Sequence, residues 1–315
     1  AAISIPSISP YWMLIYVTLL ILFLNWHKRT RRNQLIITVL ILVNCLVYKD
    51  LLQNTRGLKI TFLDVGQGDS ALLEFPGGKT MLIDAGDRTE YMDYGQQVIL
   101  PFLQRRGIRT LDALLLTHPH ADHIGGAIAL LQNIQVKRII KTFISGGEPY
   151  AAIVDSLVEY RQIPQIHPLS GDTLLIDQEV LLLVMHPSRR FAQPPSIAAE
   201  LNNSSIVLMC RFYNHAVLFC GDAEIGAEQE MLRFGDLLKC EILKMGHHGS
   251  ASASSRLFRE VTAPKVAVVS VAKRNRFGLP SERLLSDMEK EGIRLLRTSD
   301  QGAIVFLLRR GSEKL

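Results

Sequence analysis

The chain has 315 residues, of which 48% are hydrophobic, and it carries a formal net charge of +5. This length allows one large core domain plus a further segment. Its four cysteines lack paired CxxC spacing, which argues against a zinc knuckle. Its net charge is too small to identify a polyanionic partner.

The apolar residues are concentrated at the start of the chain. Two uncharged runs, at 11–26 and 35–48, flank the basic stretch HKRTRR at 27–32. With their flanking residues, both runs reach the ~20 residues that a spanning helix needs, and neither has a polar face at helical spacing. The pattern predicts a two-helix membrane hairpin over residues 1–56 in preference to two buried core helices. The first residue, Ala1, suggests a piece of a longer protein.

The basic stretch also predicts an orientation in the membrane. Cytoplasmic connections carry an excess of Lys and Arg, and four such residues lie between the two runs, against three beyond them. We therefore expect the connection in the cytoplasm and all residues after 50 outside it. The opposing residues are Lys28, Arg29, Arg31 and Arg32 in the connection, and Lys49, Arg56 and Lys59 beyond it.

From residue 57 onward, short apolar runs alternate with turns and amphipathic segments. Such runs indicate strands, and apolar residues at helical spacing indicate helices. The first half predicts strands at 58–65, 70–75, 80–86 and 111–117, a helix at 94–107 broken by Pro101, and a helix at 125–134.

A second half repeats this texture with strand-like runs such as SSIVLMCRFY, HAVLFCGD, CEILKMG and PKVAVVSVA. Two similar halves of strands and helices predict an α/β domain over residues 57–315. We expect an αβ/βα sandwich, with two mixed sheets face to face, helices outside, and the chemistry at the strand ends.

Histidine and aspartate gather where four of these strands end. His and Asp suit zinc, manganese or iron, and a packed core gains nothing from three imidazoles within six positions. We therefore predict a metal site in preference to a solvated polar turn. The residues are Asp84, the cluster His118, His120, Asp122 and His123, then Asp222, and the pair His247 and His248.

The spacing further predicts how these groups divide. His118 and His120 are expected to face one ion, and Asp122 and His123 a neighbouring one, with Asp222 as a bridge. Two such ions would activate water and hold the attacking and leaving oxygens of a phosphodiester. The cofactor expected is one or two divalent ions, zinc or manganese.

The histidine cluster and its surroundings resemble a known family. THPHADHIGG is similar to the HxHxDH signature of the metallo-β-lactamase superfamily. Together with FLDVGQGDSALLEFPGGKTMLIDAG, VLFCGDAE, LKMGHHGSASAS and RTSDQGAIVF, in this order, it resembles the C-terminal part of the ComEC competence family over nearly all of residues 10–310.

The resemblance implies a multi-pass protein of the bacterial inner membrane with a hydrolase domain outside the cytoplasm. It implies a nuclease that degrades one strand of incoming DNA while the other strand crosses the membrane. The implied partners are single-stranded DNA at the entry channel, the lipid bilayer, the channel part of the same family protein and other DNA-uptake components.

Two departures from the family pattern concern ligands. Many members of the fold have a further ligand histidine before the Asp222 equivalent, where this chain has Asn202 and Asn203. His186 could reach the site or be structural. Related sequences often read YGHPHP where this chain reads FGLPSE, with Leu279 and Ser281 in place of histidines.

Supporting roles are expected for several other residues. Asp84 is predicted to orient the histidine loop rather than to bind metal. Gln67 and Asp69 could touch substrate or simply form a turn, and Lys244 could meet a phosphate or a surface carboxylate. Ser250, Ser252 and Ser254 are predicted to cap the helix that starts near SRLFREV. His167 and His215 are expected to be structural.

A basic turn follows the predicted strand PKVAVVSVA. Lys273, Arg274 and Arg276 could track a nucleic-acid backbone or form a solvated loop. We count no aromatic residue among them, so base stacking is not predicted.

The sequence therefore favours a metal-dependent DNA nuclease. Two alternatives stay open: a metallohydrolase of a small ester, lactone or thioester, because one fold hosts many reactions, and a catalytically weak DNA-binding or gating module.

Overall fold

The computed structural model describes residues 57–143, 148–191 and 201–311, together with isolated residues between positions 16 and 44. Contacts divide the chain into two compact units, Ala1–Arg56 and Gly57–Leu315, and each is considered by itself. Within the described residues, no helix is both long and apolar enough to cross a membrane. Most of the hairpin predicted at 1–56, including its basic connection and Cys45, lies outside the described residues.

Two seven-stranded sheets form the frame of the second unit. The first runs in the order β16 (Ile304–Arg309), β1 (Gly57–Phe62), β2 (Ala71–Glu74), β3 (Thr80–Ile83), β5 (Ala113–Leu116), β7 (Ile139–Lys141) and β8 (Gln165–Ile166). The second runs in the order β15 (Arg294–Arg297), β14 (Val266–Val269), β13 (Ile242–Lys244), β12 (His215–Phe219), β11 (Val207–Phe212), β10 (Leu181–His186) and β9 (Thr173–Leu174). A short parallel pair, β4 (Thr110–Leu111) and β6 (Gln135–Val136), lies beside them.

Both sheets are mixed in the same way. In the first, β16, β1, β2 and β3 pair antiparallel, and the strands from β3 to β8 pair parallel. In the second, β9 to β12 pair antiparallel and β12 to β15 pair parallel. The predicted sandwich of two mixed sheets is therefore confirmed.

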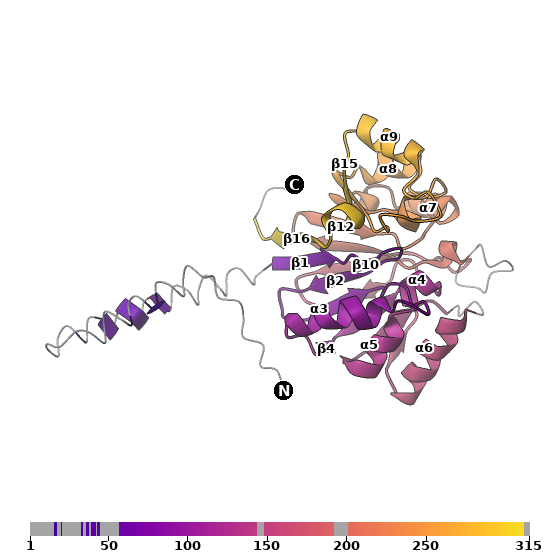
Figure 1. Ribbon diagram of the computed structural model, residues 1–315. Helices are drawn as coiled ribbons and strands as arrows, with labels where there is room; N and C mark the ends of the chain where they lie inside the picture. Colours follow the sequence, from indigo (N-terminus) through magenta and orange to yellow (C-terminus); the bar gives the residue numbers. More distant parts are fainter. Residues whose placement is uncertain are drawn as a thin grey trace. The chain divides into compact units, whose positions relative to one another are not determined.

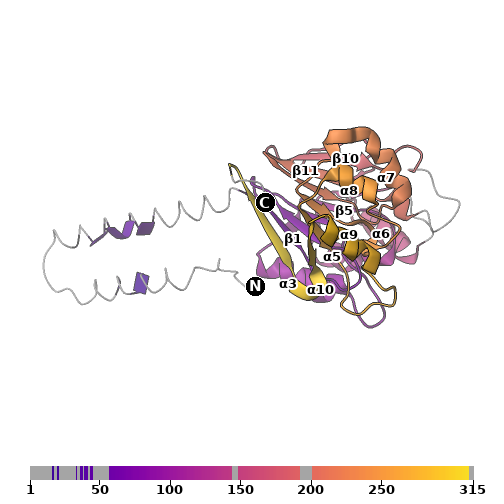
Figure 2. The ribbon, with the colours of Figure 1, turned by 90° about the horizontal axis from the view of Figure 1, so that it is seen from above.

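Helices cover the outer faces of the two sheets (Figures 1 and 2). On the first sheet lie η1 (Gly95–Ile99), α3 (Leu100–Arg105), α4 (Ala121–Ile124), α5 (Ala127–Asn133) and α6 (Pro149–Tyr160). On the second lie α7 (Ile225–Met231), α8 (Arg256–Thr262) and α9 (Glu282–Lys290). The remaining helical turns are η3 (Asn202–Ser204), η4 (Leu232–Leu238), η5 (Gly246–Gly249) and α10 (Thr298–Gln301).

The core follows from the two-residue period of the strands. In β3, Met81 and Ile83 pack between the sheets, whereas Leu82 packs against the helices outside. Because both faces are covered, the parallel strands read as continuous apolar runs. Phe62 of β1 and Phe219 of β12 meet across the two sheets, with ring centroids 5.7 Å apart.

Two details differ from the sequence prediction. Pro101 does not end the predicted helix: it lies in the first turn of α3, directly after the π-helix η1. Its missing N–H falls where the hydrogen-bond pattern changes from π to α. The segment 304–309 was not predicted as a strand, yet β16 pairs with β1 along its whole length and forms the edge of the first sheet.

Candidate metal centre

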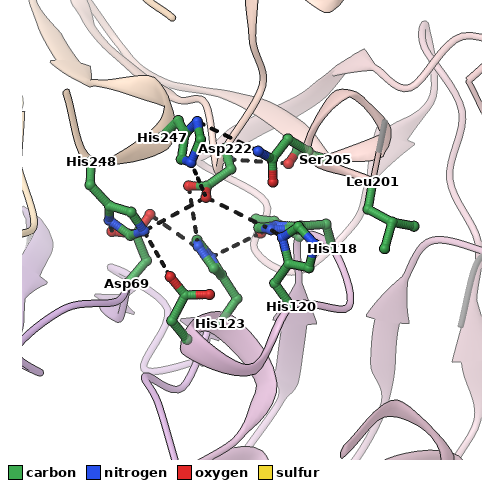
Figure 3. Close-up of polar contacts among 12 residues, drawn as sticks. Asp69, His118, His120, His123, Leu201, Ser205, Asp222, His247 and His248 are labelled. Carbon is green, nitrogen blue, oxygen red and sulfur yellow. Dashed lines mark hydrogen bonds and ion pairs between the residues drawn. The ribbon is translucent and has the colours of Figure 1, made fainter. Parts of the chain in front are cut away.

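The predicted metal residues come together because the strands that precede them end at one edge of the sandwich. β3 and β5 are parallel neighbours in the first sheet, as are β12 and β13 in the second. Their carboxyl ends therefore point the same way within each sheet. Figure 3 shows that His118, His120, His123, Asp222, His247 and His248 converge there.

Asp222 lies at the centre of the cluster. Its Oδ2 atom is 3.8 Å from Nε2 of His118 and 4.0 Å from Nε2 of His247. His120 lies beside His118, with 3.0 Å between its Nδ1 and the His118 Nε2. These three imidazoles and Asp222 form the first half of the cluster.

The second half consists of Asp122, His123, His248 and the same Asp222. The Nε2 atom of His123 is 3.2 Å from Oδ1 of Asp222. The Nε2 atom of His248 is 3.1 Å from Asp122 and 3.6 Å from Oδ2 of Asp222. One ligand atom from each of the four residues falls within 4.8 Å of the others, a spacing that suits a metal ion.

The donors fit a divalent cation. Among the described residues, His123 Nε2 and Asp222 Oδ1 are buried atoms without a hydrogen-bond partner, although they face each other. Buried polar atoms normally have such partners. Imidazole nitrogens and carboxylate oxygens are the ligand types that zinc and similar ions take. The residues present therefore fit one or two such ions, with Asp222 placed to contact both halves.

Charges within the cluster shift its pKa values in opposite directions. Burial alone would raise the pKa of Asp222, but His123 and His248 hold it well below its usual range. Burial opposes protonation of His248, yet Asp222 and Asp122 raise its pKa to about 9. Burial and the neighbouring His123 lower the pKa of His118. Burial also opposes protonation of His123, but Asp222 and Asp84 raise its pKa well above its usual value. A metal ion would compete with protons for these imidazoles.

Hydrogen bonds behind the cluster orient its imidazoles. Nδ1 of His123 contacts Asp84 at 2.8 Å, and Asp84 also accepts from the backbone N–H and hydroxyl of Thr117. Nδ1 of His248 donates to the Ser270 carbonyl at 2.9 Å. Both rings thereby present Nε2 to Asp222, and Asp84 occupies the orienting position predicted for it.

Two glycines, Gly95 before the histidine cluster and Gly126 after it, permit this packing. A Cβ atom at Gly126 would lie 2.1 Å from the carbonyl oxygen of Ala85, and one at Gly95 would lie 2.1 Å from the carbonyl oxygen of Gly126. No side chain fits at such distances. The absence of a Cβ therefore lets the start of α5 lie against the segment after β3, where Asp84 is placed.

Glu224 belongs to the site although the sequence analysis did not select it. Its Oε1 accepts hydrogen bonds from His247 Nδ1 at 2.7 Å and Ser252 Oγ at 2.8 Å, and a weaker one from Asn202 at 3.3 Å. Such a carboxylate fixes the ring of a metal-binding histidine. The motif GDAE, with a second acid two residues after Asp222, was the available signal.

The asparagines and His186 surround the cluster without entering it. The side chain of Asn202 contacts Glu224 and His247 rather than Asp222. Oδ1 of Asn203 accepts from backbone N–H groups at the start of α7. Nε2 of His186 contacts the Asn203 carbonyl at 2.7 Å. His186 thus has a structural position, which is the second of the two alternatives predicted for it: reaching the metal site or supporting the fold.

Asp69 and Lys244 form a buried ion pair, with 2.5 Å between Nζ and Oδ2. Only 7% of the Asp69 side chain and 4% of the Lys244 side chain are exposed. Lys244 therefore pairs with a buried carboxylate rather than a surface one, and Asp69 belongs to the interior side of its turn. All three residues of β13 are buried, so Lys244 points into the interior, where Asp69 also lies 3.7 Å from Nδ1 of His248.

Smaller expectations also change. The N-terminal cap of α8 is Ser255, whose Oγ accepts from the Phe258 N–H, and not Ser250, Ser252 or Ser254. Ser250 instead bonds Ser252. The Gln67 side chain accepts from the Ala272 N–H at 3.5 Å. His167 contacts the Lys141 carbonyl, and buried His215 contacts Glu241 at 2.7 Å.

The described cysteines, Cys210, Cys220 and Cys240, are buried and form no disulfide.

The comparisons with known proteins agree with this geometry. A family model described as the metallo-beta-lactamase superfamily matches residues 63–189. ComE operon protein 3 of Bacillus subtilis is 31% identical over 96% of this chain and 40% of its own length. Competence protein ComA of Neisseria gonorrhoeae is 29% identical over 88% of this chain and 36% of its own length.

Among solved structures, Zn²⁺-bound PqqB from Methylobacterium extorquens superposes with a TM-score of 0.51. It covers 79% of this chain and 99% of PqqB at 11% identity, a likeness of fold alone. The chain spans less than half the length of the competence proteins named above. It nevertheless matches them over nearly all of its own residues, and it therefore belongs to the ComEC competence family, in the part that contains the metallo-β-lactamase fold.

Proposed function

We propose that residues 57–315 are a metal-dependent phosphodiesterase that hydrolyses DNA during uptake. The observation that carries the proposal is the position of Asp222, whose two carboxylate oxygens face different histidines. Family membership supports DNA as the substrate. The geometry supports a reaction in which two oxygens on one phosphorus must be held at once.

A bound divalent ion would lower the pKa of a coordinated water and polarise a phosphoryl oxygen. We propose His118, His120, His247 and Asp222 as ligands of one ion, and Asp122, His123, His248 and Asp222 as ligands of the other. Zinc and manganese both suit this set of donors.

The protein groups then have separate tasks. Asp222 lies between the two halves and holds them together; only 2% of its side chain is exposed. Asp122 is the more accessible carboxylate, with 28% of its side chain exposed. Burial would raise the pKa of Asp122, but His123 and a hydrogen bond from His248 lower it. Such a carboxylate is a weak base. Asp122 therefore accepts a hydrogen bond from the attacking water and orients it.

The location is part of the proposal. We infer a domain on the outer side of the cell membrane, which rests on the basic stretch at 27–32 and on the competence relatives. The bilayer, the channel part of the family protein and other uptake components are the expected partners. Protease added to intact cells should cut residues 57–315 if the orientation is right, and should leave them intact if it is reversed.

The test begins with metal content. The purified 315-residue chain should bind about two Zn²⁺ or Mn²⁺ ions and then cleave DNA. Asp222→Ala and His120→Ala should abolish cleavage, whereas Asp236→Ala, on the exposed surface, should not. Cleavage that survives both site variants would contradict the proposal.

Parallel assays separate the alternatives. Hydrolysis of a chromogenic ester in preference to DNA would favour the small-molecule hydrolase. Tight DNA binding by a chain that retains no metal would favour the binding or gating module.

A further inference from the structure

The loop after β14 lies beside the candidate metal centre. β12, β13 and β14 are adjacent parallel strands, so the segments that follow them share one edge of the sheet. The start of the loop is held by His248, which contacts the Ser270 carbonyl at 2.9 Å. Its end is held by the Ser281 N–H, which donates to the Gly249 carbonyl at 2.9 Å. Residues 272–280 therefore form part of the rim of the site.

Asn275 makes this loop rigid from within. Its Nδ2 donates to the carbonyls of Ala272 at 3.2 Å and Leu279 at 2.7 Å. Its Oδ1 accepts from the N–H groups of Phe277 at 3.2 Å and Leu279 at 2.9 Å. One side chain thus joins both ends of the turn, and the residues at its tip are presented in one conformation. Such preorganisation lowers the entropy cost of binding.

The tip of the loop combines cations with an aromatic ring. Lys273, Arg274 and Arg276 are exposed, and in the described part of the chain they take part in no ion pair. Phe277 directly follows them and is 58% exposed. The guanidinium carbon of Arg276 lies 4.8 Å from the centroid of its ring. No aromatic residue is interleaved among the three cations, but the ring that directly follows them packs against the last one.

This combination matches the chemistry of an unpaired nucleic-acid strand. Cations track the phosphates, and an exposed ring stacks on a base of any sequence. In a duplex the faces of the bases are already stacked, so the ring has nothing to cover. We propose that Phe277 and its basic turn are the stacking platform that holds single-stranded DNA beside the metal centre. This inference rests on the proposed function.

The test measures binding rather than cleavage. Fluorescence anisotropy of the 315-residue chain in EDTA would follow three labelled 16-mers: oligo(dT), an abasic strand of the same charge, and a duplex. Phe277→Ala should weaken oligo(dT) binding roughly tenfold, because one lost stacking contact has this order of effect. It should leave the abasic strand unchanged, and Phe277→Tyr should keep wild-type affinity.

Matched variants separate stacking from charge. Arg274→Gln should weaken both single strands and reduce the salt dependence of binding by about one phosphate contact. Tyr160→Ala removes another exposed ring, 86% exposed at the end of α6, and should change nothing. Melting temperatures of all variants should agree with the wild type.

Three results would overturn the inference. Equal losses by Phe277→Ala on oligo(dT) and on the abasic strand would mean that the ring does not stack. If Phe277→Ala binds oligo(dT) as tightly as the wild type, and the metal-loaded wild type cleaves DNA, the platform is rejected but the proposed nuclease is kept. If Phe277→Ala loses binding to phosphatidylserine vesicles but keeps DNA binding, the tip of the loop contacts a lipid surface instead.

Discussion

Replacing Glu224 by glutamine is expected to weaken metal binding about fivefold while leaving the fold intact. Oε1 of Glu224 accepts a 2.7 Å hydrogen bond from Nδ1 of His247, and the Glu224 side chain is 20% exposed. Glutamine keeps the shape of the side chain and can still accept that hydrogen bond, but it loses the charge. A hydrogen bond to a charged group contributes about 1 kcal/mol more than a neutral one, and 1.4 kcal/mol is tenfold in affinity.

The assay is a competition between the metal-free chain and a chromogenic chelator for Zn²⁺. Glu230→Gln is the matched control, because Glu230 lies on the same helix and pairs only loosely with Arg190, at 3.6 Å. His247→Ala sets the full effect of losing the ligand. If Glu224→Gln matches the wild type while His247→Ala loses affinity, Glu224 does not support the ligand. If neither variant changes affinity, His247 is not a ligand at all.

Three further predictions concern stability, measured by denaturant unfolding without metal. Lys244→Met should lower the free energy of unfolding by about 3–5 kcal/mol, because it removes the cation that pairs with the buried Asp69 carboxylate. The double variant with Asp69→Leu should recover most of the loss, and a single-variant loss below about 1 kcal/mol would contradict this. Burial lowers the pKa of His186 to about 4 from 6.5, so the unfolded chain binds this proton first, and stability should fall by roughly 3 kcal/mol as pH drops from 6.5 to 4. His186→Gln should flatten that acid limb, and an unchanged limb would exclude His186 as its source. Gly126→Ala should destabilise strongly, since its Cβ would meet a backbone oxygen at 2.1 Å, whereas Gly226→Ala, with contacts of 3.4 Å or more, should be neutral; equal effects would reject the close-approach argument.

Much of the domain could be predicted from the sequence because the signals are local. A two-residue apolar period identifies strands, and apolar runs identify those buried on both faces, as in β5 and β12. The ligand residues His118 to His123 lie within six positions of one another. Their common position after a strand was enough to predict a metal site at a strand end.

Other features depended on contacts between distant parts of the chain. Lys244 and Asp69 are 175 positions apart in the sequence. Only the packing of β13 against the turn after β1 shows that they pair. His248 and Asp122 are separated by 126 positions and come from different sheets. Neither periodicity nor composition carries information about such pairs.

The sequence by itself determined which residues could bind metal and on which kind of segment each of them lies. The tertiary structure alone decided that Asp222 faces both groups of histidines, that Glu224 supports His247, and that the turn bearing Phe277 stands beside them. The physical reason is that ligand chemistry belongs to single side chains, whereas their meeting depends on how two sheets pack, which is set by many weak contacts at once.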